Sequence, residues 1–573
     1  MTIDEKYALW CSRATEDPDL TEELAAIAGQ PAEIRERFYR ELEFGTGGLR
    51  GILGAGENRM NIYTVRKATQ GLANYLKGRY AASAVAISYD SRIKSDHFAR
   101  EAACVLAANG IQVHLFPQLE PTPLLSYAVR YYGCQAGIMV TASHNPAKYN
   151  GYKCYGADGC QMTDADAGAV TTCIRALDIF DDVQTVAYAD AVADGRITLI
   201  GEKLLESYYG EVLAQQIHPG VCAEAGLKVI YTPLNGTGNL PVREVLRRIG
   251  AGQVLVVPEQ ELPDGHFPTA PYPNPEIRQA FERALAMAET EKPDLLLATD
   301  PDCDRVGIAV RNGSDYTLMT GNEVGCLLLD YIIRGRREAG TLPADPVVVK
   351  TIVTTGLAAA IAERNGCELR NVLTGFKYIG EQIGLLEKEG HAERYILGFE
   401  ESYGYLAGSY VRDKDAVVAS MLITEMAAYY RTQGISLLQQ MQTLYREYGY
   451  YSHALINVAF EGEQGMNTMT RLMDNLRQTP PTEIGGLRVL GCADYRERVH
   501  HDAVTGVDTP LTLPRSNVLA YTLENNAGVI VRPSGTEPKI KAYITATGKD
   551  AAAAGALEEK LRAATQALLQ AEE

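Results

Sequence analysis

One pattern occurs three times in the chain and limits what it can fold into. An apolar stretch typical of a strand precedes a helical pattern, which ends at a glycine and is followed by a short second strand. The glycines are Gly110, Gly250 and Gly366, each suited to the left-handed position that closes a helix. The preceding strands are expected at 85–88, 229–231 and 347–349. The sequence therefore predicts an α/β protein with three repeated βαβ-type mixed-sheet domains.

Each repeat is followed by a different polar loop, and each loop comes directly after another apolar strand. The loops are 141–146, 299–305 and 398–404. Ligands of open α/β sheets bind outside the carboxyl ends of the strands. We therefore expect the three loops to form one central active-site cleft, with a nucleophile, a metal site and a group that reads substrate hydroxyls.

The first loop presents Ser143 in the run Thr-Ala-Ser-His-Asn-Pro, after the apolar residues 137–140. Pro146 removes a hydrogen-bond donor and ends any continuation of the strand. Thr141 and Asn145 stand where the hydrolase nucleophile elbow has glycines, so that motif is absent. Ser143 is a candidate nucleophile of another kind. His144 is the one histidine we place in the site, where ordering the turn and catalysis are equally open roles.

The second loop holds Asp300, Asp302 and Asp304, which alternate along extended backbone and so point to one side. Three hard oxygen ligands suit Mg²⁺. A helix-loop-helix calcium site would need glycine and glutamate where this chain has Arg305 and Arg311, so we reject that alternative.

The third loop carries Glu400 and Ser402 between two glycines. A carboxylate and a hydroxyl can bind sugar hydroxyls, although an acidic turn is the better explanation when the loop is considered by itself.

A fourth part of different character, which we expect to be a C-terminal α+β domain, begins near residue 453. It contains a strand at 454–458, a hairpin around 525–528 and a C-terminal amphipathic helix at about 550–571. Small residues and hydroxyls between two cations suit a phosphate dianion. The predicted phosphate-binding residues are Arg532, Ser534, Gly535, Thr536 and Lys539.

Length and charge narrow the class of protein. A chain of 573 residues is too long for one core, and we expect domains at 1–205, 206–320, 321–452 and 453–573. A net charge of −18 argues against nucleic acid as a partner. Eleven cysteines without a CxxC pair indicate reduced thiols in the cytoplasm. No apolar run suits a signal peptide or a membrane span.

Taken together, the loops resemble those of the α-D-phosphohexomutase superfamily, which includes phosphoglucomutases and phosphomannomutases. The resemblance covers nearly the whole chain and follows the family's motif order. The matching motifs are GTGGLR at 45–50, TASHNP at 141–146, NGYK at 150–153, DPDCDR at 300–305, GFEES at 398–402 and RPSGTEP at 532–538. The run 374–380 together with GFEESYGY is similar to the long branch that holds phosphoglucomutases and phosphopentomutases.

The resemblance implies an isomerase that moves a phosphoryl group within a sugar phosphate. Phospho-Ser143 would be the donor and a ligand of Mg²⁺ with the three aspartates. Lys153 would act as a general acid/base or a charge clamp, assisted by Arg50 and Arg305. Cations expected in the substrate region are Lys377, Arg412 and Lys414, of which the last two could equally be solvated.

The implied reaction interconverts glucose 1-phosphate and glucose 6-phosphate through glucose 1,6-bisphosphate, which also serves as activator. Mannose and pentose phosphates remain alternative substrates on this scaffold. A metal-dependent phosphatase, a silent sugar-phosphate sensor and a sugar-bisphosphate synthase are rival functions. The expected partners are small sugar phosphates, with no nucleic acid and no membrane, and the protein is expected to be a monomer or a dimer.

Overall fold

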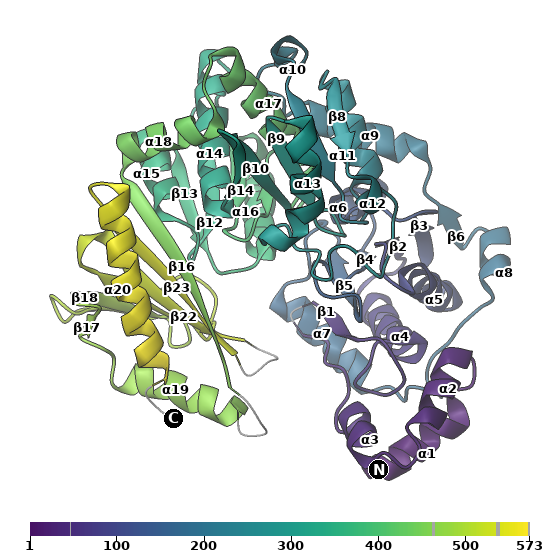
Figure 1. Cartoon of the computed structure of the whole chain (residues 1–573). Coiled ribbons are helices and arrows are strands. Elements are labelled where there is room, and N and C mark those ends of the chain that lie inside the picture. Colours follow the sequence, from purple (N-terminus) through teal and green to yellow (C-terminus); the bar gives the residue numbers. More distant parts are fainter. Residues whose placement is uncertain (46, 461–464, 535–538, 571–573) are drawn as a thin grey trace. The chain divides into compact units, whose positions relative to one another are not determined.

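The computed structural model describes residues 1–573 except 46, 461–464, 535–538 and 571–573 (Figure 1). The described residues form two compact units. The first comprises residues 1–324 and 379–436, and the second comprises residues 325–378 and 437–573. Each unit is described by itself below. All eleven cysteines are free thiols, as predicted. Within the described residues, no helix combines the length and apolar character needed to cross a membrane.

The predicted repeat is present in all three places. The helices end before Gly110, Gly250 and Gly366, whose φ angles are 74°, 83° and 72°. Only glycine adopts this left-handed conformation without steric cost, which is why the pattern is readable in the sequence. In each repeat the two strands flanking the helix pair in parallel. The strand–helix–strand triplets are β2 (Ala84–Tyr89), α5 (Ser95–Ala108) and β3 (Gln112–Leu115); β7 (Lys228–Thr232), α11 (Asn239–Arg248) and β8 (Gln253–Val256); and β12 (Val347–Thr351), α15 (Gly356–Arg364) and β13 (Glu368–Val372).

The first module has a six-stranded mixed sheet in the order β1-β5-β4-β2-β3-β6. The strand β4 is buried throughout and pairs in parallel with β2 and antiparallel with β5, so the chain leaves β4 directly into the serine loop. Three N-terminal helices join the same core, in which Trp10 packs edge-on against Phe38 and Tyr63. The further elements are α1 (Ile3–Arg13), α2 (Pro18–Ala26), α3 (Pro31–Phe38), β1 (Gly48–Ile52), α4 (Ile62–Arg79), α6 (Thr122–Tyr132), β4 (Ala136–Val140), β5 (Tyr149–Gly156), α7 (Asp164–Arg175), α8 (Tyr188–Ala193) and β6 (Ile197–Leu199).

The second module has a five-stranded mixed sheet in the order β11-β10-β9-β7-β8. Its strand β9 is fully buried and pairs in parallel with β7 and antiparallel with β10, which places the aspartate loop between β9 and β10. The further elements are α9 (Glu202–Leu213), α10 (Val221–Ala225), α12 (Pro258–Glu261), η1 (Arg278–Phe281), α13 (Glu282–Glu291), β9 (Leu295–Thr299), β10 (Val306–Asn312) and β11 (Asp315–Met319).

The third module contributes residues to both units. In the first unit, β14 (Tyr395–Phe399) pairs antiparallel with the short β15 (Tyr405–Leu406), and the loop between them holds Glu400 and Ser402. Asp415 caps the buried helix α17 (Ala416–Thr432) by accepting hydrogen bonds from Val417 N and Val418 N. The remaining elements are α14 (Gly321–Glu338), α16 (Phe376–Lys388), η2 (Ala392–Arg394) and α18 (Leu437–Tyr448).

The C-terminal part is α+β, as predicted. Its antiparallel sheet has the order β16-β23-β22-β21-β18-β19-β20, with β17 paired to β18. Helices α19 and α20 bury Met473 and Leu561 against the sheet, and α20 lies along β23 (Figure 1). The elements are β16 (Tyr450–Ala459), α19 (Gly465–Gln478), β17 (Glu483–Ile484), β18 (Leu487–Asp494), β19 (Val499–Asp502), β20 (Asp508–Pro510), β21 (Leu519–Leu523), η3 (Glu524–Asn526), β22 (Gly528–Pro533), β23 (Lys539–Gly548) and α20 (Ala551–Gln570).

Candidate active site

Three polar loops of the first unit follow the strands β4, β9 and β14, as the sequence predicts. Each loop turns sharply at one residue other than glycine. The φ angles are 51° at Ser143, 51° at Cys303 and 67° at Tyr403. Left-handed backbone is costly for residues with a side chain and persists only where surrounding contacts hold it. The three turns are therefore built features of the fold.

Ser143 lies at the centre of this region and is half-buried. Its Oγ donates a hydrogen bond to Asp300 Oδ2 at 2.7 Å and lies 3.1 Å from His144 Nδ1. Burial, reinforced by the charge of Arg305, lowers the pKa of His144 well below its ordinary value. His144 is thus a neutral imidazole at pH 7. Because the serine hydroxyl has a single proton, the Nδ1–H tautomer of His144 fits this arrangement by donating to Oγ.

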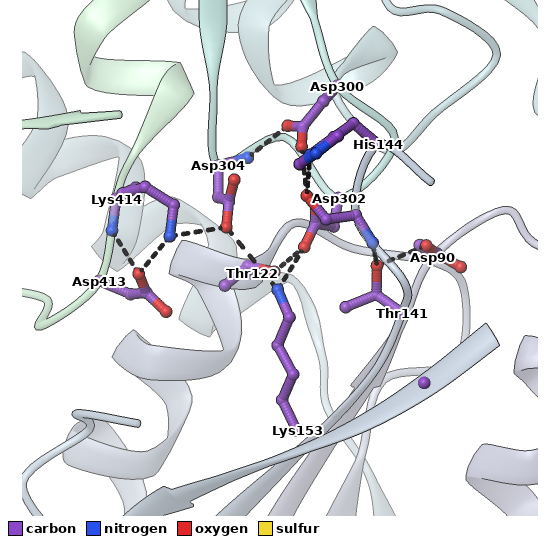
Figure 2. A network of polar contacts seen from close by, with 12 residues as sticks. Asp90, Thr122, Thr141, His144, Lys153, Asp300, Asp302, Asp304, Asp413 and Lys414 are labelled. Carbon is purple, nitrogen blue, oxygen red and sulfur yellow. Dashed lines mark hydrogen bonds and ion pairs between the residues drawn. The ribbon is translucent and has the colours of Figure 1, made fainter. Parts of the chain in front are cut away.

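Asp300, Asp302 and Asp304 form one buried cluster, with carboxylate oxygens all within 4.8 Å of one another (Figure 2). Asp302 Oδ1 and Asp304 Oδ1 are buried with no hydrogen-bond partner. Buried carboxylate oxygens are normally satisfied, so this pair fits a cation. An all-oxygen donor set of this kind suits Mg²⁺. Cys303 is buried outside this donor set and hydrogen-bonds Thr299.

Two lysines balance the charge of the cluster. Lys153 reaches from β5 to Asp302 Oδ2 at 2.9 Å and to Asp304 at 3.8 Å, and Lys414 lies 3.0 Å from Asp304 (Figure 2). Burial opposes the charge of Lys153, but the two aspartates outweigh it and raise its pKa. Burial and the neighbouring Asp302 raise the pKa of Asp300 well above its ordinary value. Although burial acts the other way, Lys153 and a hydrogen bond from Asp300 lower the pKa of Asp302. Lys153 is therefore a cation held beside Asp302 and Asp304.

The Glu400 loop is joined to the aspartate loop through the backbone. Arg305 and Gly404 form an antiparallel bridge, and Val306 N donates to Tyr403 O at 3.1 Å. Glu400 is 5 % exposed, and its charge acts on both Arg305 and Lys414. Gly404 is required here because a Cβ at this position would lie 2.2 Å from Lys414 Cδ.

Three predicted arginines occupy different places. Arg50 is exposed on β1 opposite Gly151, whose carbonyl accepts a hydrogen bond from Thr141 N at the end of β4. Arg305 is bound to Glu276 at 2.5 Å. Arg412 is fully buried and donates to Glu387 at 2.8 Å.

The alternative that Arg412 and Lys414 are solvated is wrong. Arg412 pairs with Glu387, and Lys414 pairs with Asp304 as well as with the adjacent Asp413. Glu387 and Asp304 come from other segments, so the local sequence did not indicate the burial.

The remaining predicted residues belong to the second unit. Lys377 is buried, with Nζ 5.0 Å from the ring centre of Tyr378. Arg532 lies on β22 opposite Lys541, and Ser534 N donates to Lys539 O at 2.7 Å, which closes the base of the predicted phosphate loop. The predicted residues Gly535 and Thr536 lie outside the described residues.

Sequence reasoning missed a group of residues that supports the loops. Asp90 and Arg92 follow β2 and contact the serine loop, while Thr122 donates through Oγ1 to Asp302 Oδ2 at 3.0 Å. Asp413 accepts from Lys414 at 3.0 Å (Figure 2). It also accepts from Tyr155 Oη at 2.7 Å. A signal existed for Asp90, which follows an apolar strand of the first repeat just as the analysed loops follow theirs.

Comparison with known protein families gives four matches in chain order. They are the phosphoglucomutase/phosphomannomutase alpha/beta/alpha domains I, II and III at residues 41–179, 207–313 and 320–448, and the C-terminal domain of the same family at 455–564. The matched ranges follow the order of the four predicted domains, whose exact limits remain predictions.

Relatives with the same extent are named phosphoglucomutase. One from Staphylococcus epidermidis is 37% identical over 515 residues, covering 90% of this chain and 92% of its own. One from Staphylococcus aureus strain USA300 is 36% identical over 516 residues, covering 90% and 91%. In fold, the chain is similar to parafusin, a phosphoglucomutase of Paramecium, with a TM-score of 0.69 and 16% identity over 93% of this chain and 96% of that one. The chain thus belongs to the phosphoglucomutase/phosphomannomutase family of the α-D-phosphohexomutase superfamily.

Proposed function

We propose that this protein is a phosphoglucomutase, which interconverts glucose 1-phosphate and glucose 6-phosphate through a phosphoserine at Ser143. The observation that carries the proposal is the hydroxyl of Ser143 held 2.7 Å from Asp300, at the edge of a buried three-carboxylate cluster. The 37% identical relative named phosphoglucomutase supports the choice of sugar.

Asp300, Asp302 and Asp304 would hold Mg²⁺, together with a phosphate oxygen on Ser143. When bound, the ion neutralises negative charge on the transferring phosphoryl group. Lys153 adds a second positive charge from β5, and the neighbouring aspartates raise its pKa. It would serve as a charge clamp, or as a general acid in one direction of the transfer and the general base in the reverse direction. Arg50 and Arg305 are the further cations that we assign to this phosphate.

The chemical step is a phosphoryl transfer from Ser143 to a sugar hydroxyl. The hydroxyl oxygen of the sugar monophosphate forms a bond to phosphorus, the bond from phosphorus to Ser143 Oγ breaks, and the hydroxyl proton ends on Oγ. His144 lies 3.1 Å from Oγ in its neutral form and keeps the side chain oriented. The bisphosphate then presents its other phosphate to Ser143, the reverse transfer follows, and the isomer leaves.

The cycle needs a site that holds the phosphate at the far end of the sugar. We assign this role to the loop of Arg532, Ser534, Gly535, Thr536 and Lys539, with Lys377 as an additional cation. Glu400 and Ser402 would bind ring hydroxyls, and Arg412 and Lys414 would support that region. The proposal extends to a sugar 1,6-bisphosphate that rephosphorylates Ser143. The eleven free thiols support a cytoplasmic enzyme, which we propose to act as a monomer or a dimer.

A comparison of substrates tests the assignment of glucose. We expect kcat/KM for glucose 1-phosphate to exceed that for ribose 1-phosphate, because a site that hydrogen-bonds ring hydroxyls rejects a sugar that lacks one of them. Mannose 1-phosphate differs from glucose 1-phosphate only in the configuration of the 2-hydroxyl, which we assign to no residue, so we expect it to turn over at a lower rate. A higher value for ribose 1-phosphate would identify a phosphopentomutase. Release of inorganic phosphate without isomerisation would identify a phosphatase, and release of the bisphosphate as product would identify a synthase.

A further inference from the structure

One buried arginine donates hydrogen bonds to several backbone carbonyls of the serine loop. Arg92, with its side chain fully buried, directs its two terminal nitrogens at four backbone carbonyl oxygens, three in the serine loop and one at the first residue of β5. Nη2 donates to Ser143 O at 2.5 Å and also to Asn145 O, and Nη1 donates to Pro146 O and Tyr149 O, both at 3.0 Å. A planar guanidinium has the fixed fork of donors that such an arrangement needs.

Asp90 fixes the backbone N–H of Ser143 through the hydroxyl of Thr141. Its Oδ2 accepts from Thr141 Oγ1 at 2.6 Å, and that hydroxyl oxygen accepts from Ser143 N at 2.8 Å (Figure 2). Asp90 Oδ1 accepts from Arg92 N at 2.9 Å and from Ser95 Oγ at 2.8 Å, which ties the carboxylate to the start of α5. Asp90 and Arg92 also form an ion pair at 3.4 Å.

The two sets of contacts meet at the backbone of Ser143. Its N–H is fixed through Thr141 and Asp90, and its C=O is fixed by Arg92. This residue has a φ of 51°, a conformation that a serine in a free turn seldom adopts. We propose that Asp90, Arg92 and Thr141 form a positioning clamp that holds Ser143 in this left-handed conformation and thereby aims Oγ at Asp300.

The clamp holds Ser143 through its backbone, and its side-chain hydrogen bonds go to none of the three aspartates, so it predicts a distinct kinetic signature. Misdirecting a phosphoryl donor by a fraction of an ångström slows the transfer while leaving the contacts to the substrate in place. A loss of the clamp should therefore lower kcat with KM nearly unchanged. It should also release the loop, which hydrogen exchange of backbone amides can measure without any substrate.

The test compares Arg92→Lys and Thr141→Val with wild type. A lysine ammonium has three donors at one point and cannot satisfy four separated carbonyls, and valine lacks the hydroxyl. We expect each variant to lower kcat at least tenfold with KM within twofold, and to speed amide exchange in residues 141–150 at least tenfold. Exchange in β2 and β9 should stay as in wild type. Thr141→Ser keeps the hydroxyl and should recover most of the loss.

The matched control is Arg59→Lys. Arg59 is also a buried arginine, bound to Glu36 and to the carbonyl of Asn58, and makes no recorded bond to the serine loop. Wild-type kcat and loop exchange in Arg92→Lys, or an equal loss in Arg59→Lys, would overturn the proposal. Should Arg92→Lys fail to fold, the Thr141 variants decide, and wild-type kcat in Thr141→Val overturns it.

The kinetic arm rests on the proposed mutase reaction, whereas the exchange arm does not. A wrong choice of sugar would leave all variants inactive on glucose 1-phosphate and still leave loop exchange responsive to Arg92→Lys. A wrong clamp would leave loop exchange unchanged in an active enzyme. The two failures are therefore distinguishable.

Discussion

Ser143 and Asp300 are 157 positions apart in the sequence, yet the hydroxyl of one donates to the carboxylate of the other at 2.7 Å. The bond joins the loop after β4 in the first module to the loop after β9 in the second. The proposed nucleophile from one sheet and a proposed metal ligand from another thus share one hydrogen bond. The predictions that follow test the roles proposed for these two side chains and for the residues around them.

Replacing Ser143 by alanine should abolish isomerisation and leave the fold intact, since the change removes only a half-buried hydroxyl from a turn. Turnover of glucose 1-phosphate and circular dichroism measure the two effects. Intact-protein mass spectrometry of active wild type should show one phosphoryl group, mapped to Ser143 by peptide analysis. Full activity in Ser143→Ala would remove the phosphoserine from the mechanism.

Removing divalent cations with EDTA should inactivate the enzyme, and Mg²⁺ should restore activity better than Ca²⁺. The smaller ion prefers the near-octahedral geometry that three carboxylates, water and a phosphate oxygen provide. Asp302→Asn should reproduce the loss, whereas Asp315→Asn at an exposed position of the same module should not. Activity that survives exhaustive chelation would make the aspartate cluster structural.

Arg532→Ala should weaken binding of the sugar phosphate by roughly 1.5–3 kcal/mol, the scale of a hydrogen bond to a charged group. The loss should appear as a higher KM for glucose 1-phosphate and for the activating bisphosphate alike. Arg515→Ala removes an exposed positive charge from the same part of the chain and serves as the control. Equal KM values for Arg532→Ala and wild type would place the phosphate site elsewhere.

Glu120→Gln should stabilise the protein at alkaline pH. Glu120 is 5 % exposed, its recorded side-chain bond is one from Gln118 at 3.0 Å, and burial raises its pKa from 4.5 to about 7. The unfolded chain loses this proton near pH 4.5 and the folded chain near pH 7, so folding stability falls as pH rises between these values and stays lower above them.

The size of this effect is up to about 3 kcal/mol, from 1.36 kcal/mol for each pKa unit. Glu120→Gln should raise the thermal midpoint clearly at pH 8 and much less at pH 5. Glu289→Gln, at an exposed site, should change neither midpoint. A midpoint difference that is the same at pH 5 and pH 8 would contradict the assigned titration.

The sequence predicts the repeat and the site loops because their signals are local. Gly110, Gly250 and Gly366 have the positive φ that the helix ends require, and the aspartates that alternate after β9 do converge. The residues that support these loops contact partners far away in the sequence, so their burial and contacts could not be predicted from local patterns. Arg92 acts on carbonyls more than fifty residues away, and Lys414 is buried because Asp304 lies beside it. The three N-terminal helices, which join the core through Trp10, were likewise not predicted.

The bridge between Arg305 and Gly404 limits how substrate preference can change in this architecture. The backbone that follows the three aspartates and the backbone that follows Glu400 and Ser402 are joined by this bridge and by the hydrogen bond from Val306 N to Tyr403 O, so we expect a shift of one to displace the other. An insertion or deletion between Phe399 and Gly404 would displace Arg305 and, with it, Asp304. We therefore expect that exchanging side chains on this loop can change the preferred sugar, whereas changing the length of the loop would abolish the reaction.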